Sequence, residues 1–195
     1  MEVPSPSAIT GLILAGGAGR RMGGQDKGWV RYHGAPLIET VLERLRPQVS
    51  GILISANRTL ERYAALGYPV LQDPAINPAT PDYQGPLAGI LQGLAACHTP
   101  WLQIVPCDTP HFPTTLVATL QSAAHTPYLA IVPEVNGRAQ WVFCLLHKNC
   151  LAPLRMQFDQ GQRALGKALS ILPLQRIVMA DPDGTAFENL NSLQP

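Results

Sequence analysis

The sequence predicts an α/β protein with a three-layer, Rossmann-like fold built on a mostly parallel, mixed sheet. Short apolar runs alternate with segments whose apolar residues recur at helical spacing, an alternation typical of parallel βαβ units. The chain of 195 residues contains 17 glycines and 19 prolines, which indicates short elements separated by many turns. Hydrophobic residues make up 46% of the chain, which excludes wholesale disorder and suffices for a buried core.

The apolar pattern defines the elements of the first half of the chain. The run 9–15 is too short for a helix and is bounded by glycine, so it is predicted to be a buried first strand. Pro36 is tolerated in a first helical turn and precedes apolar residues at helical spacing, so a helix is predicted at 37–45. The same reasoning predicts strand 51–55, helix 60–66, strand 70–72, helix 85–97, strand 102–105 and helix 114–124.

The second half alternates less regularly. Asn136-Gly137 is a strong hairpin signal between two apolar runs, so strands are predicted at 128–132 and 140–146, and the sheet is expected to be mixed. The remaining elements are predicted as a helix at 147–158, a second helix ending near Leu169 and a strand at 174–178.

A basic, glycine-rich stretch follows the first strand. Its glycines and positively charged residues are Gly16, Gly17, Gly19, Gly23, Gly24, Arg20, Arg21 and Lys27. Glycines let backbone N–H groups turn toward an anion, and the positive charges beside them suit a triphosphate. The stretch is no P-loop, because Gly28 rather than Ser or Thr follows Lys27. It also fits a dinucleotide fingerprint poorly, because the third glycine would fall at Met22.

Polar residues follow several predicted strands at their carboxyl ends. Ser55 and Asn57 follow the second strand, Asp73 the third and Asp108 the fourth. Ligands of open parallel sheets bind at these ends, so the residues are expected near the glycine-rich stretch. Asp108 is the metal candidate, because Mg²⁺ prefers carboxylate oxygens and can bridge them to a triphosphate. Alternatively, Asp108 caps the following helix or forms an Asx turn with Thr109.

Four stretches of the chain together resemble one enzyme family. They are 14–27 (Leu-Ala-Gly-Gly-x-x-x-Arg-Met-Gly-Gly-x-Asp-Lys), 85–89 (Gly-Pro-Leu-Ala-Gly), 107–110 (Cys-Asp-Thr-Pro) and the Asn-x-Asn element within 187–192. The pattern closely resembles the molybdenum cofactor guanylyltransferases and implies a nucleotidyltransferase fold. The length suits one domain, 1–195. This domain is expected to comprise a flexible N-terminus (1–8), a nucleotide-binding half (9–110) and an acceptor-binding half (111–195).

The resemblance also implies a reaction. The terminal phosphate of molybdopterin would attack the α-phosphorus of GTP, pyrophosphate would leave, and the guanine dinucleotide form of the molybdenum cofactor would result. The expected cofactor is Mg²⁺, with Mn²⁺ as the alternative. The expected partners are GTP, molybdopterin or Mo-molybdopterin, and molybdenum cofactor insertion and recipient proteins.

The resemblance assigns roles to particular residues. The implied catalytic residues are Arg21, Lys27 and Asp108, of which Asp108 is also the metal ligand. The implied nucleotide-binding residues are Leu14, Ala15, Gly16, Gly17, Lys27, Ser55, Asn57, Asp73, Gly85, Pro86, Leu87 and Asp108. The residues expected on the acceptor side are Arg138, Gln140, Arg163, Asn189 and Asn191.

Two positions depart from the family pattern, and two other functions stay open. Relatives often carry Asn where this chain has Ser55, and His-Pro or Gln-Pro where it has Gln140-Trp141. Trp141 is expected to pack in the core, with stacking on the pterin as the alternative. A cytidylyltransferase of the same fold and a non-catalytic nucleotide-binding or cofactor-delivery protein are the alternative functions.

Composition bounds the partners and the compartment. The net charge is +1, and no dense stripe of Lys and Arg occurs outside the glycine-rich stretch, so no nucleic-acid partner is expected. No run approaches the length of a membrane span, and no basic segment precedes the first apolar run, so a cytoplasmic protein without membrane association is expected. The four cysteines are widely spaced and are expected to be reduced thiols.

Overall fold

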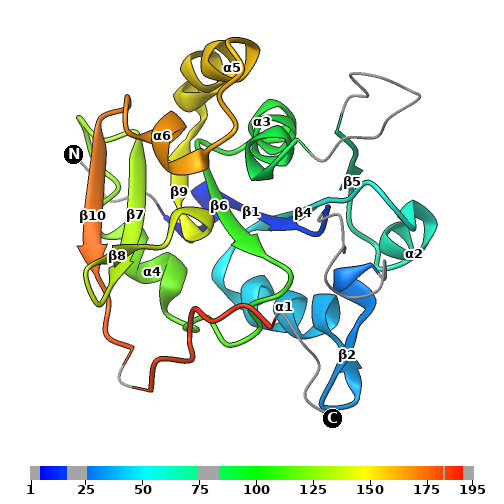
Figure 1. Cartoon of the computed structure of the whole chain (residues 1–195). Helices are drawn as coiled ribbons and strands as arrows, with labels where there is room; N and C mark the ends of the chain where they lie inside the picture. The colour runs from blue at the N-terminus through cyan, green and yellow to red at the C-terminus, as the bar shows by residue number, and fades with distance from the viewer. Residues whose placement is uncertain (1–4, 17–25, 74–83, 182, 191–195) are drawn as a thin grey trace.

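An eight-stranded mixed sheet forms the centre of the structure, a computed structural model that describes residues 5–16, 26–73, 84–181 and 183–190. The strand order is β10-β7-β9-β6-β1-β4-β5, and β8 pairs with β7 (Figure 1). The strands are β1 (Ile9–Leu14), β4 (Gly51–Ser55), β5 (Val70–Leu71), β6 (Trp101–Pro106), β7 (Ala130–Val135), β8 (Arg138–Ala139), β9 (Leu145–His147) and β10 (Leu174–Val178). The short strands β2 (Arg31–Tyr32) and β3 (Ala35–Pro36) form a separate hairpin.

The strand directions confirm the predicted α/β fold with a mostly parallel, mixed sheet. Strands β6, β1, β4 and β5 run parallel to one another, and β10 runs parallel to β7. Strand β9 lies between β6 and β7 and is antiparallel to both. The carboxyl ends of β1, β4 and β6 therefore meet at one edge of the sheet, where β1 has a neighbour on each side.

Helices cover both faces of the sheet and make three layers (Figure 1). Helices α3 (Pro86–Ala96), α5 (Leu151–Asp159) and α6 (Leu165–Leu169) pack on one face, and α1 (Leu37–Leu45) and α4 (Leu116–Gln121) pack on the other. Helix α2 (Leu60–Ala64) connects β4 to β5. The 3-10 helices are η1 (Pro6–Ala8), η3 (Lys27–Trp29), η4 (Arg46–Gln48), η5 (Trp141–Phe143) and η6 (Lys148–Cys150).

The residues of β1 show how the two faces are filled. Leu12 packs into the cluster beneath α3, α5 and α6, whereas Ile9 and Ile13 pack into the opposite cluster with α1 and α4. All three side chains are completely buried. A strand buried on both faces consists almost entirely of apolar residues, which is why the pattern at 9–15 could be recognised from the sequence.

Three predicted elements have the same bounds in the structure: the helix at 37–45 and the strands at 51–55 and 174–178. The predicted hairpin at Asn136-Gly137 is also confirmed, since β7 and β8 flank it and both residues have positive φ angles of 50° and 73°. Such angles at both central positions are those of a type I′ turn.

The strand predicted at 140–146 is confirmed only at Leu145 and Leu146, which belong to β9, because the 3-10 helix η5 lies between β8 and β9. Both strands pair with β7, so the chain bulges out of the sheet between them. The buried Gln103 side chain donates from Nε2 to the Phe143 carbonyl at 2.9 Å and thus satisfies a backbone group that the bulge removes from the sheet. A polar side chain on a neighbouring strand therefore supports the interruption.

Other predicted boundaries shift by a few residues. The helix predicted at 147–158 begins at Leu151, because His147 ends β9 and its Nδ1 atom accepts the Asn149 backbone N–H ahead of η6. The strand predicted at 128–132 occupies Ala130–Val135, and the helix predicted at 114–124 occupies Leu116–Gln121.

Within the described ranges, no helix is both long and apolar enough to span a bilayer.

Candidate active site

A cavity of about 230 Å³ lies at the carboxyl edge of the sheet. Leu14, Ser55 and Pro106 are the last residues of β1, β4 and β6, and all three line it. The start of α3 contributes Gly85, Pro86 and Gly89, and the other lining residues are Gly16, Lys27, Asp73, Cys107, Asp108, Val142 and Asn189. The cavity therefore lies where ligands of open parallel sheets bind.

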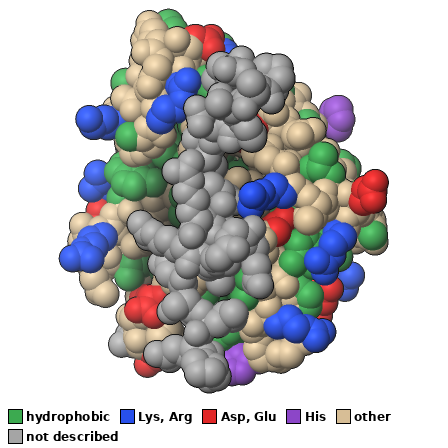
Figure 2. Space-filling model, turned by 45° about the vertical axis from the view of Figure 1, so that its right-hand side comes forward, with side chains coloured by type: hydrophobic (Ala, Val, Ile, Leu, Met, Phe, Trp, Pro, Cys, Tyr) green, Lys and Arg blue, Asp and Glu red, His purple; other side chains and the backbone are tan. Residues whose placement is uncertain are grey.

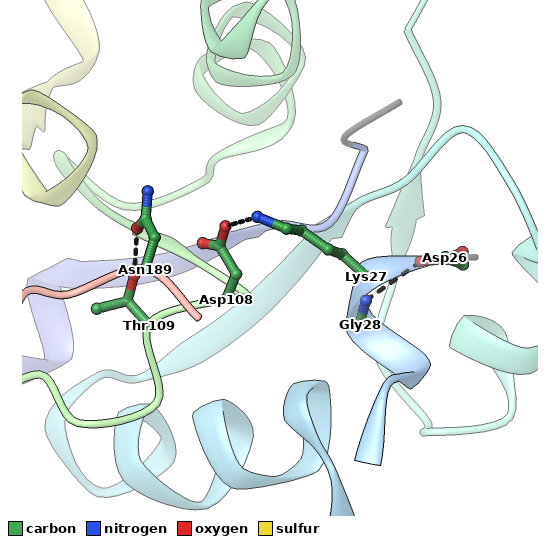
Figure 3. A network of polar contacts seen from close by, with 6 residues as sticks. All are labelled: Asp26, Lys27, Gly28, Asp108, Thr109 and Asn189. Carbon is green, nitrogen blue, oxygen red and sulfur yellow. Dashed lines mark hydrogen bonds and ion pairs between the residues drawn. The ribbon is translucent and has the colours of Figure 1, made fainter. Parts of the chain in front are cut away.

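Lys27 and Asp108 form an ion pair in this cavity (Figure 3). Lys27 begins η3, and Asp108 follows β6, so the contact joins residues that are 81 positions apart. The Lys27 Nζ atom donates to the Asp108 Oδ2 atom, and the two side chains are only 18% and 13% exposed. The predicted cation and the predicted metal ligand thus lie side by side.

Asp73 is held by Asn57 at the edge of the cavity. The Asn57 Nδ2 atom donates to Asp73 Oδ2 at 2.8 Å, and the Asp73 backbone N–H donates to Asn57 Oδ1 at 2.9 Å. The other carboxylate oxygen, Oδ1, is buried and has no hydrogen-bond partner in the described structure. Burial raises the pKa of Asp73, and the hydrogen bond from Asn57 lowers it by less. Asp73 lines the cavity, and its Oδ1 atom is an acceptor for which the described residues supply no donor.

The C-terminal segment returns to the loop that carries Asp108. The Leu190 backbone N–H donates to the Asp108 carbonyl at 2.8 Å. The hydroxyl of the fully buried Thr109 donates to Asn189 Oδ1 at 2.8 Å, and Figure 3 shows the Asn189 nitrogen directed away from Thr109. Phe187 anchors this segment, since its ring lies 5.0 Å from the Phe143 ring in an edge-to-face arrangement.

The structure brings together most of the residues predicted to bind a nucleotide, but not all of them. Ala15 and Leu87 are buried and do not line the cavity, and Asn57 does not line it but lies against the lining residues Gly16 and Asp73. The predicted residues Gly17 and Arg21 lie outside the described residues. The site roles of the remaining residues stay predictions.

The residues predicted on the acceptor side are dispersed. Asn189 lines the cavity, whereas Arg138 and Gln140 lie on and just after β8, and Asn191 lies outside the described residues. The Arg163 guanidinium stacks 3.8 Å from the centre of the Phe158 ring, and its Nη1 atom donates to the Phe158 carbonyl at 2.6 Å. Its role in acceptor binding therefore remains a prediction.

Both departures from the family pattern have a packing explanation. A Cβ atom at Gly89 would lie 2.4 Å from Ser55 Oγ, so α3 packs directly against the small side chain of Ser55. A Cβ atom at Gly166 would lie 2.9 Å from the ring of Trp141, so the half-buried Trp141 packs against α6 at the margin of the core.

Four lining residues did not appear among the predicted site residues: Gly89, Pro106, Cys107 and Val142. Gly89 and Cys107 belong to the motifs at 85–89 and 107–110, so their sequence neighbours contained the signal. Val142 carried no such signal, because its position depends on η5.

All four cysteines are free thiols, as expected, and burial raises the pKa of Cys107.

The donor set determines what kind of metal ion the cavity could hold. Among the described residues, no three His, Cys, Asp or Glu side chains are grouped closely enough to hold an ion. A single carboxylate suits Mg²⁺ if phosphate oxygens and waters supply the other ligands.

On the face in Figure 2, the Lys and Arg side chains stand apart, so the described residues form no continuous basic stripe there.

The chain is similar to known proteins in both sequence and fold. Residues 11–173 match the model of the MobA-like NTP transferase domain. A molybdenum cofactor guanylyltransferase from Ralstonia nicotianae is 44% identical over 197 residues, which cover 96% of this chain and 93% of that protein. A second molybdenum cofactor guanylyltransferase, from Cupriavidus taiwanensis, is 42% identical over 95% of this chain and 92% of that protein.

A solved structure has the same fold. The crystal structure of molybdopterin-guanine dinucleotide biosynthesis protein A from Archaeoglobus fulgidus superposes with a TM-score of 0.71 at 21% identity, and the match covers 87% of this chain and 83% of that one. The fold matches, and the sequence similarity to the Ralstonia and Cupriavidus proteins extends over almost the whole chain. The chain therefore belongs to the molybdenum cofactor guanylyltransferases, a family of nucleotidyltransferase enzymes.

Proposed function

We propose that the protein transfers GMP from GTP to the terminal phosphate of molybdopterin, releasing pyrophosphate and forming the guanine dinucleotide form of the molybdenum cofactor. Membership of the family supports this activity. The observation that carries the proposal is the ion pair between Lys27 and Asp108 in the cavity at the carboxyl ends of β1, β4 and β6. It places a phosphate-binding cation beside a carboxylate suited to a divalent metal ion.

Asp73 supports guanine as the base. Guanine presents two adjacent donors, N1–H and the N2 amino group, and a carboxylate can accept from both. The unpartnered Oδ1 atom of Asp73 and its Oδ2 atom, already held by Asn57, form such an acceptor pair. Cytosine carries only one amino group on that edge, beside two acceptors, so the carboxylate favours GTP over CTP.

The chemistry needs positioning and charge neutralisation more than a base. The acceptor phosphate is already an anion, so its oxygen can attack the α-phosphorus directly as the bond from that phosphorus to pyrophosphate breaks. Lys27 would place positive charge beside the phosphates, and Arg21 is proposed to do the same. Asn189, with Arg138, Gln140, Arg163 and Asn191, is proposed to bind the acceptor.

Asp108 is proposed to hold Mg²⁺, or Mn²⁺ as the alternative, together with triphosphate oxygens. When bound, the ion would neutralise charge on the α-phosphate and the departing pyrophosphate. The four free thiols fit a reducing compartment, and we place the reaction in the cytoplasm. Cofactor insertion and recipient proteins would take up the product.

Pyrophosphate release from GTP, molybdopterin and Mg²⁺ tests the proposal. Lys27→Met and Asp108→Asn are each expected to lower kcat by about 100-fold or more, because the first removes a positive charge beside the phosphates and the second removes the carboxylate proposed to hold the metal ion. Lys148→Met and Asp159→Asn serve as matched controls, since both side chains are exposed and neither lines the cavity. These controls are expected to keep the wild-type rate.

The alternatives give different outcomes in the same assay. Faster pyrophosphate release with CTP than with GTP would identify a cytidylyltransferase. Tight GTP binding without pyrophosphate release would identify a non-catalytic binding or delivery protein. Full activity in Asp108→Asn would contradict the proposed metal site.

A further inference from the structure

Asp26 forms a polar cluster on the side of η3 that faces away from the cavity. Lys27 and Asp26 are neighbours in the chain, yet Figure 3 shows their side chains pointing in opposite directions. The Asp26 Oδ1 atom accepts from the Tyr63 hydroxyl at 2.6 Å and from the Gly28 backbone N–H at 3.3 Å. Its Oδ2 atom accepts from the Thr59 hydroxyl at 2.5 Å. Hydrogen bonds thus connect the turn that carries Lys27 to Tyr63 of α2 and to Thr59, the residue that precedes α2.

Tyr63 is the central member of this cluster. Its side chain is completely buried, although it belongs to a five-residue helix whose other residues are exposed or half-buried. A Cβ atom at Gly28 would lie 2.3 Å from the Tyr63 hydroxyl, so only glycine allows η3 to approach this closely. Burial raises the pKa of Tyr63, and the hydrogen bond to Asp26 raises it further, so the hydroxyl remains a proton donor.

Aromatic and cation–π contacts reinforce the same packing. The rings of Tyr63 and Trp29 lie 5.1 Å apart, and the Arg62 guanidinium lies 3.9 Å from the centre of the Trp29 ring. Both ends of η3 are therefore held against α2, Asp26 by hydrogen bonds and Trp29 by its contacts with the Tyr63 ring and the Arg62 guanidinium. Lys27 lies between them and extends toward Asp108. A long, flexible lysine side chain acts from a defined point only when its backbone is held in this way.

We propose that Tyr63 is a positioning residue for Lys27, because its hydroxyl holds Asp26 and thereby fixes the turn from which Lys27 reaches the phosphate site. The inference rests on the proposed function and deepens it: Tyr63 lies outside the cavity lining and acts only through Lys27. A purely structural role would change stability but would not depend on the presence of the Lys27 ammonium.

Tyr63→Phe tests this role, because it keeps the ring and removes only the hydroxyl. We expect kcat for pyrophosphate release to fall about tenfold, in line with loss of one hydrogen bond to a charged group, while KM for molybdopterin stays unchanged. Thr59→Val, at an exposed position, removes the other hydroxyl donor to Asp26 and is expected to lower kcat by a smaller factor. Tyr128→Phe is the matched control, since Tyr128 is half-buried beside His125 and does not line the cavity.

A double mutant separates positioning from general destabilisation. In a Lys27→Met background, Tyr63→Phe is expected to change the residual rate less than twofold, because the group that it positions is absent. An equal tenfold loss in both backgrounds, or no loss in the wild-type background, would overturn the inference.

Binding measurements keep the inference distinguishable from the proposed function. If the wild-type protein released no pyrophosphate, the proposed function would fail. The inference would then be decided by calorimetry: weaker binding of GTP to Tyr63→Phe, with unchanged binding of guanosine, would support it. Equal binding of GTP to the wild-type protein and to Tyr63→Phe would contradict it.

Discussion

At the scale of single residues, the environment of Asp73 predicts how nucleotide binding depends on pH. Only the carboxylate form can accept from both guanine donors, and burial raises the pKa of Asp73 above its ordinary value of 3.8. GTP affinity is therefore expected to fall as the pH drops through this raised pKa, before an exposed aspartate would be protonated. Calorimetric titration with GTP over a series of pH values measures the effect.

Asp73→Asn provides the control. Its side chain does not titrate, so any pH dependence of GTP binding that the variant shares with the wild-type protein comes from the nucleotide or from other groups. The variant is expected to bind GTP more weakly and to lose this part of the pH dependence. An unchanged pH profile of GTP binding in Asp73→Asn would show that another group controls binding.

The raised pKa of Asp73 has the opposite effect on folding, because the protonated side chain favours the folded state. The contribution of Asp73 to stability is therefore present below pH 3.8 and is lost as the pH rises through the raised pKa.

At the scale of elements, two glycines let α3 lie close to the sheet. A Cβ atom at Gly89 would lie 2.4 Å from Ser55 Oγ and 3.2 Å from Ser55 Cβ, so rotation of the hydroxyl alone cannot relieve the contact. Gly89→Ala is therefore expected to move α3 away from β4 at the cavity and to weaken GTP binding about tenfold or more. Calorimetry and thermal unfolding together measure the change.

Gly93→Ala is the matched variant one helical turn further along α3. Its Cβ atom would lie 2.5 Å from Leu12 and 3.0 Å from Leu102, both buried away from the cavity lining. Overpacking is expected to lower stability by up to about 2 kcal/mol after allowance for the better helix propensity of alanine. GTP affinity should stay close to wild type, and equal loss of affinity in both variants would contradict the distinction.

At the scale of the whole molecule, the C-terminal segment completes the site formed by the first half of the chain. Phe187 packs on Phe143, and the residues after it reach Asp108 and Thr109. Phe187→Ala is expected to cost about 1–2 kcal/mol of stability, less than a fully buried phenylalanine would. It is also expected to lower pyrophosphate release more than GTP affinity, because Asn189 loses its anchor. Steady-state kinetics beside GTP calorimetry measure this split, and equal losses would show that the segment serves nucleotide binding.

The sequence was most informative where structure is local. Apolar runs and helical spacing located the α-helices and the longer strands of the main sheet, and the glycine-rich stretch, Asp73 and Asp108 indicated the site because they follow strands. Prediction failed at 140–144, where η5 takes the place of the expected strand. The Gln103 side chain that supports this interruption comes from a different strand, so no window of sequence around 140–146 contains the cause.

The sequence by itself determined the fold class, the family pattern and the main chemical groups, because each depends on short-range periodicity or on motifs of fixed spacing. Only the tertiary structure decided how those groups are held. The contact between Tyr63 and Asp26 joins residues 37 positions apart, and that between Thr109 and Asn189 joins residues 80 positions apart. Such contacts arise only when packing of the helices on the sheet brings distant segments together, and for that reason residues that hold Lys27 and Asn189 in place leave no local signal in the sequence.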